Sequence, residues 1–130
     1  MKVEGTFEVK MSPASNPEDR QEGISLDRML LDKTYNGELS GTGQGEMLTA
    51  ITPTKGSAGY VAIEQVRGRL MDKEGSFVLQ HYGLMGGGEE TLVLEIVPDS
   101  GSGDLVGIKG RMSIQIQDGV HHYTLEYDLP

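Results

Sequence analysis

VGIKGRMSIQIQDGVHHYTLEYDL, residues 106–129, carries the clearest structural signal in this sequence. In residues 106–117, apolar or small side chains alternate with polar ones, and residues 120–129 show the same period of two. Asp118-Gly119, between the two segments, is a dipeptide favoured in two-residue β-hairpin turns. The stretch therefore predicts two antiparallel strands joined by a tight turn.

The same alternation recurs towards the N-terminus, in short segments separated by Gly, Pro, Asn, Asp and Ser. Strands are predicted at residues 2–11, 28–39, 43–53, 60–70, 76–85 and 91–98. Residues 12–23, with two prolines, are predicted to form a loop. Residues 26–31 also fit a short helix, but a strand is favoured because their surroundings are all strand.

About eight strands at this spacing are typical of an all-β barrel or sandwich. A single closed antiparallel β-barrel of about eight strands, covering residues 1–130 as one domain, is our prediction, and a two-sheet sandwich is the alternative. Closure removes the open sheet edges that otherwise promote aggregation. The 19 glycines support many tight turns and strongly coiled strands.

Composition narrows the range of functions. A formal net charge of −9 disfavours binding to nucleic acid and to anionic membranes. The chain has no cysteine, which excludes disulfides, thiolate nucleophiles and Cys-based zinc sites. No apolar run has the form of a signal peptide or approaches the roughly 18 residues of a membrane span, so we expect a soluble cytoplasmic protein.

Two glycine-containing segments resemble phosphate-binding loops but do not fit their patterns. GTGQGE (41–46) and GSGD (101–104) lack the following helix and the Gly-Lys-Ser/Thr signature. The sequence also has no Gly-x-Ser-x-Gly elbow of the kind that serine hydrolases use. Both glycine segments are therefore interpreted as turns.

Glu64 and His81 are the candidate catalytic residues. Glu64 shares one face of its predicted strand with apolar residues, and His81 lies on the face of Phe77 and Leu79. Because the two strands are consecutive, the side chains are expected to meet inside the barrel. Such a pair can act as general acid and base. It can equally be a hydrogen-bonded polar pair that only stabilises the barrel interior, because a buried charge needs a partner.

The predicted ligand-binding residues are Tyr35, Tyr60, Glu64, His81 and Tyr123, placed around a pocket that holds a small, largely apolar ligand. The alternatives are an isomerase or cyclase that uses Glu64 and His81, and a filled barrel with a structural or oligomeric role. His121 and His122 are adjacent in a strand and point to opposite faces. Together they cannot bind one ion. One of them could join His81 and Glu64 in a His-Glu-His zinc set if the strands were neighbours, but nothing in the spacing demands it, and we expect neither a metal nor an organic cofactor.

Residues 76–82 and 91–97 carry apolar side chains on both strand faces. One face of each segment would meet water in an isolated barrel. Apolar exteriors of this kind usually find a partner, and two-fold dimers are the commonest solution. We therefore expect a homodimer.

Several segments resemble the DUF3224 family of uncharacterised bacterial proteins. They are KTYNGELSGTGQGEML (33–48), GSAGYVAIEQVRGRL (56–70), GSFVLQHYG (75–83), VPDSGSGDLVGIKG (97–110) and HHYTLEYDL (121–129). The resemblance implies an allene oxide cyclase-like β-barrel and favours the barrel over the sandwich. Plant cyclases bind a fatty-acid epoxide inside a similar barrel, but no cyclase motif is found here, so that activity does not carry over.

Overall fold

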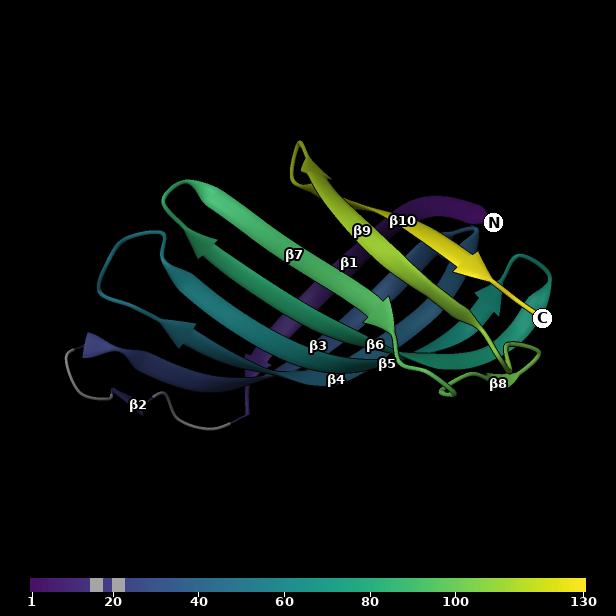
Figure 1. The fold of residues 1–130 in the computed structure, drawn as a ribbon, viewed down its shortest axis with the longest axis horizontal. Coiled ribbons are helices and arrows are strands. Elements are labelled where there is room, and N and C mark those ends of the chain that lie inside the picture. The colour runs from purple at the N-terminus through teal and green to yellow at the C-terminus, as the bar shows by residue number, and fades with distance from the viewer. Residues whose placement is uncertain (15–17, 20–22) are drawn as a thin grey trace.

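The chain folds into a closed antiparallel β-barrel, as predicted (Figure 1). The computed structural model describes residues 1–14, 18–19 and 23–130. The barrel strands are β1 (Lys2–Pro13), β3 (Ser25–Gly37), β4 (Leu39–Ile51), β5 (Ala58–Leu70), β6 (Lys73–Gly86), β7 (Glu89–Ile96), β9 (Lys109–Gln117) and β10 (Val120–Asp128). Two short strands lie outside this ring: β2 (Glu18–Asp19) pairs with β3, and β8 (Ser102–Gly103) pairs with β6.

The strand order around the barrel is β1-β10-β9-β7-β6-β5-β4-β3, and pairing between β3 and β1 closes the ring. All of these neighbours except β1 and β10 follow one another along the chain, so the topology is a meander whose first and last strands are adjacent. The segment from 26 to 31 lies inside β3 and is not helical, so the preference for a strand is confirmed. Part of the predicted 12–23 loop, residues 15–17 and 20–22, lies outside the described residues.

The predicted Asp118-Gly119 turn is confirmed. Gln117 pairs with Val120, and both turn residues have positive φ, at 52° and 78°. These angles are typical of the type I′ turns that suit the twist of a β-hairpin. The same end of the barrel carries the β4–β5 and β6–β7 hairpins, so we call it the hairpin end.

One predicted strand begins too early. Residues 106–108 alternate like a strand, but β9 begins at Lys109. Gly107 has a φ of 85°, which bends the chain out of the extended conformation. The loop 97–108 instead covers the barrel wall beside the first half of β6 and buries Leu105 and Ile108 in the core.

The core fills the part of the barrel away from the hairpin end. Its most deeply buried aliphatic side chains are Leu39, Val66, Leu70, Leu79, Leu94, Leu105, Ile108 and Leu125. The interpretation of residues 41–46 as a turn is wrong, because they lie inside β4 and the chain turns at Glu38 instead. Gly41, Gly43 and Gly45 occupy the inward face of β4, so this part of the strand adds no side-chain volume to the interior. These glycines leave room inside the barrel, and a charged cluster occupies it.

Candidate functional site

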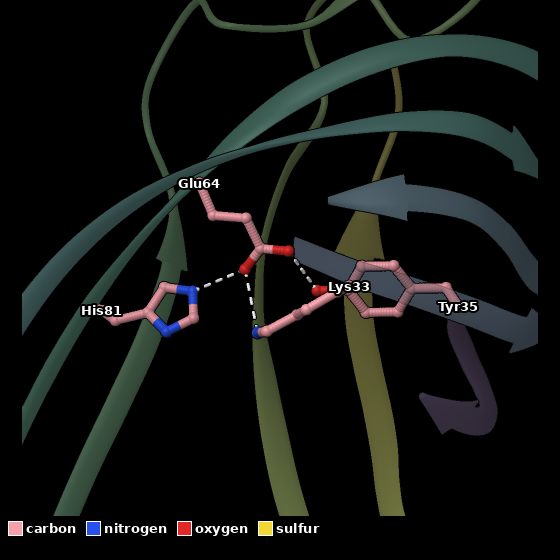
Figure 2. Close-up of polar contacts among 4 residues, drawn as sticks. All are labelled: Lys33, Tyr35, Glu64 and His81. Atoms are coloured by element: carbon pink, nitrogen blue, oxygen red, sulfur yellow. Dashed lines mark hydrogen bonds and ion pairs between the residues drawn. The ribbon is translucent and has the colours of Figure 1, made fainter. Parts of the chain in front are cut away.

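A carboxylate lies at the centre of the barrel. Glu64 is 0% exposed and accepts hydrogen bonds from side chains on three sides (Figure 2). Its Oε1 lies 2.9 Å from Nζ of Lys33 and 2.8 Å from Nε2 of His81, and its Oε2 accepts the hydroxyl of Tyr35 at 2.6 Å. The predicted pairing of Glu64 with His81 inside the barrel is therefore confirmed.

Strand register explains this convergence. His81 on β6 is paired with Ala62 on β5, so Glu64 lies two residues further along the same inward face. Lys33 and Tyr35 lie two residues apart on β3 and therefore also share a face. β4 lies between β3 and β5, and the Glu64 carboxylate lies over β4 at Gly43. A Cβ added at Gly43 would collide with Oε2 of Glu64.

The cluster keeps Glu64 ionised. Burial opposes the charge, but the hydrogen bond from His81, the ammonium of Lys33 and the hydroxyl of Tyr35 outweigh burial and hold the pKa of Glu64 at about 2. An ionised carboxylate only accepts hydrogen bonds, so the His81 proton that faces it is carried on Nε2. Burial and then the charge of Glu64 raise the pKa of Tyr35, so its phenol remains a donor.

Aromatic rings line the cluster beside Lys33. The Nζ of Lys33 lies 4.8 Å from the ring centroid of Phe7, within the range of a cation–π contact. The Phe7 ring in turn lies 5.0 Å from the ring of His121. Within the described residues, no group of three His, Asp or Glu side chains is arranged to hold a metal ion.

The other two predicted pocket residues lie in different places. Tyr60 is half-buried, and its ring meets that of His81 edge-on at 6.4 Å between centroids. Burial, followed by the charges of Glu90 and Glu64, raises the pKa of Tyr60. The ring of Tyr123 meets that of Tyr35 edge-on at 5.7 Å between centroids, but its hydroxyl bonds to backbone groups away from Glu64.

The hydroxyl of Tyr123 accepts the N–H of Leu39 at 2.9 Å and lies 2.8 Å from the Leu39 carbonyl, to which it donates. The carbonyl of Asn36 is a longer second acceptor at 3.3 Å. These bonds tie the turn between β3 and β4 to β10. Tyr123 therefore has a structural role here, on the evidence of its contacts.

Lys33, Phe7 and Gly43 are the site residues that sequence reasoning missed. Because lysine is rarely buried, the sequence alone does not favour Lys33 as an interior residue. A signal was nevertheless present, because Leu31, Lys33 and Tyr35 alternate on one face of the predicted strand.

The cluster lies where the sealed core gives way to a more open part of the barrel. On one side, the inward-facing Leu79, Leu94 and Leu125 have at most 1% of their surface exposed. Towards the hairpin end, inward-facing side chains keep part of their surface accessible, among them Val9, Tyr60, Leu92, Ile114 and His121. The part of the barrel away from the hairpin end is thus filled, and the hairpin end offers apolar surface next to the charged cluster.

Fold and site together define a small closed β-barrel with an ionised carboxylate held in its interior. The family profile described as "Protein of unknown function (DUF3224)" matches residues 3–127, and the chain belongs to this family. It is also similar to the crystal structure of a protein of unknown function from the DUF3224 family of Shewanella oneidensis MR-1. The two share 51% sequence identity with a TM-score of 0.95, over 100% of this chain and 97% of that one. No curated protein matches the chain.

No helix in the described part of the chain is long and apolar enough to cross a membrane.

Proposed function

We propose that this barrel binds a small, largely apolar ligand at its hairpin end, above the Lys33–Glu64–His81 cluster. The observation that carries the proposal is the position of the cluster between a sealed core and partly exposed inward-facing side chains. Ligand sites in proteins are mostly apolar with a few convergent polar groups. Val9, Leu92 and Ile114 supply the apolar wall in this proposal.

The polar end of the ligand rests towards Lys33 and Tyr60. The Lys33 ammonium has three N–H donors, and its hydrogen bond to Glu64 uses one of them. The hydroxyl of Tyr60 is a further polar group on the same inward face of β5. A hydrogen-bond acceptor such as a carbonyl or carboxylate on an otherwise apolar ligand suits this arrangement.

The proposal is tested with the fluorescent probe 8-anilino-1-naphthalenesulfonate, an apolar anion. We expect saturable binding of one probe per chain and an increase in the unfolding temperature, because a ligand that binds the folded state stabilises it. Ile114→Gln, on the inward face of β9, should weaken binding at least tenfold. The matched control is Ser113→Gln, which places the same side chain on the exposed outer face.

Equal binding by both variants, or no saturable binding to the native chain, would refute the proposal. Circular dichroism establishes that both variants are folded. Native mass spectrometry of the chain purified from its own host adds a direct check, since a retained small molecule appears as a mass increment lost on denaturation.

A second candidate is an isomerase or cyclase reaction in the same site, favoured by the 2.8 Å contact between His81 and Glu64. With a pKa of about 2, Glu64 is not a proton donor near neutral pH. Its role would be to orient His81 and to stabilise positive charge that develops on a substrate, while His81 moves the proton. Solvent deuterium uptake by 2-cyclohexenone, a small ketone with exchangeable hydrogens, tests this. Uptake must require His81, and uptake unchanged in His81→Asn would eliminate the candidate.

A further inference from the structure

One patch on the outer surface of four adjacent strands is apolar. Leu48, Val61, Tyr82 and Val93 lie directly opposite one another across β4, β5, β6 and β7. Ile63 and Leu84 flank this row on the same outer surface, and all six side chains are between 39% and 57% exposed. The outer face of an antiparallel sheet is normally polar. We call these six residues the outer wall.

The outer wall has a ridge beside a groove. A groove of about 650 Å³ is lined by Leu48, Val61, Ile63 and Tyr82 together with polar residues that include Arg28, Glu46 and Gln80. A smaller hollow of about 220 Å³ is lined by Tyr82 and Val93, among others, so Tyr82 is shared by both. Its side chain therefore forms a ridge between two depressions. A ridge next to a groove is self-complementary under a two-fold rotation, which seats each ridge in the groove of the other copy.

The net charge of −9 makes two copies repel over most of their surfaces, so an interface between copies is restricted to a surface with little negative charge. The margins of the outer wall suit a second copy of the chain. The six outer-wall side chains are uncharged, and charged groups lie at both margins. Arg28 pairs with Glu46 at 3.0 Å beside the groove, where Glu46 is directly opposite Ile63, and Glu95 lies at the β7 margin. A two-fold axis along the strands brings the Arg28 edge of one copy against the Glu95 edge of the other.

The outer wall is the apolar centre of a larger face. The outer surfaces of β4, β5, β6 and β7, which have 13, 13, 14 and 8 residues, together cover roughly 750 Å² with their polar margins included. A stable interface takes about 800 Å² from each partner. We propose that the outer wall is the interface of a two-fold homodimer in which the Tyr82 ridges and the Leu48–Val61–Ile63 grooves interlock.

Single-cysteine variants test this directly, because the natural chain has no cysteine. Val61 lies near the centre of the outer wall and faces the Tyr82 ridge of the other copy, so two copies of Val61→Cys should be linked into a dimer by a short bifunctional maleimide. Ser113→Cys, exposed on β9 away from the outer wall, should remain unlinked. Linking by both variants at the same rate reflects random collision and would overturn the proposal.

Sedimentation equilibrium at micromolar concentration gives the second measurement. The natural chain should have twice the 14.1 kDa mass of one copy, and Val61→Glu should reduce it to a single copy. The matched control is Val120→Glu, since Val120 is exposed to a similar degree, 44% against 49%, but lies on β10. It should remain dimeric.

Two results contradict the inference. One is a monomeric natural chain, whether or not its outer wall binds a small apolar probe, and the other is a dimer that survives Val61→Glu. Circular dichroism and the unfolding temperature of Val61→Glu separate loss of the interface from loss of the fold.

Discussion

Lys33→Met should strongly destabilise the barrel. The substitution keeps most of the buried side-chain volume but removes the positive charge that lies 2.9 Å from Oε1 of Glu64. Glu64 keeps its hydrogen bonds from His81 and Tyr35, but its charge then lacks the ammonium in a site with 0% exposure. Breaking a buried ion pair by removing one partner costs about 3–5 kcal/mol. That is a large share of the roughly 5–15 kcal/mol that stabilises a typical domain.

A second variant separates charge from packing. Lys33→Met combined with Glu64→Gln removes both charges and retains similar shapes. Replacing both partners of a buried pair is often close to neutral, so the double variant should recover at least half of the lost free energy of unfolding. Lys10→Met, at an exposed lysine of β1, is the control for substitution itself and should change stability by about 0.5 kcal/mol or less.

Urea unfolding at neutral pH, followed by circular dichroism, measures all four chains. A loss below about 1 kcal/mol for Lys33→Met, within the range of an ordinary substitution, would show that solvent already supports the charge of Glu64, and the argument would fail. If the single variant is strongly destabilised and the double variant equally so, the loss arises from the lysine stem and its contact with Phe7 rather than from charge.

Three further predictions use the same unfolding measurement. The folded-state pKa of Glu64, about 2, lies below its ordinary 4.5. Ionised Glu64 therefore contributes roughly 3 kcal/mol to the free energy of unfolding above pH 4.5, and this contribution is lost as the pH falls towards 2. Glu64→Gln should flatten this part of the pH profile of stability, and an unchanged profile would contradict the assignment. Gly43→Ala should cost about 1–3 kcal/mol because the new Cβ collides with the carboxylate, whereas Gly86→Ala, with open contacts, should cost clearly less; equal losses would count against a tight approach at β4. Tyr123→Phe should cost about 1–3 kcal/mol and speed amide exchange at Leu39, since the buried N–H loses its acceptor; unaltered exchange would exclude that role.

The barrel and its central pair follow from local pattern. Period-two alternation predicts the strands, and Asp118-Gly119 predicts its turn. Glu64 and His81 lie on consecutive strands joined by a two-residue turn, in which Leu70 pairs with Lys73. Their approach is therefore a short-range consequence of register, and the sequence was sufficient to predict it.

Lys33 depends on long-range geometry instead. It reaches Glu64 across an intervening strand, and only the glycine column of β4 makes that path free. Alternation assigns Lys33 to the face of Tyr35 but does not indicate which distant side chain lies opposite. The strand predicted to begin at residue 106 is wrong for a related reason. Residues 106–108 alternate like a strand, but the burial of Leu105 and Ile108 in the core determines the path of the backbone there.

The charged cluster also has a consequence for strand register. An apolar group of similar volume would pack in the barrel at no greater cost, so stability alone does not account for an ion pair here. A slip of β3 by one residue would turn Lys33 outward and could point Asp32 at Glu64, placing two carboxylates together in a buried site. An apolar interior would tolerate that slip far better, because a slip exchanges whole strand faces. The cluster therefore disfavours misregistered barrels whether or not a ligand binds above it, and the polar groups at the floor of the proposed site are held in place by the same contacts that align β3, β5 and β6.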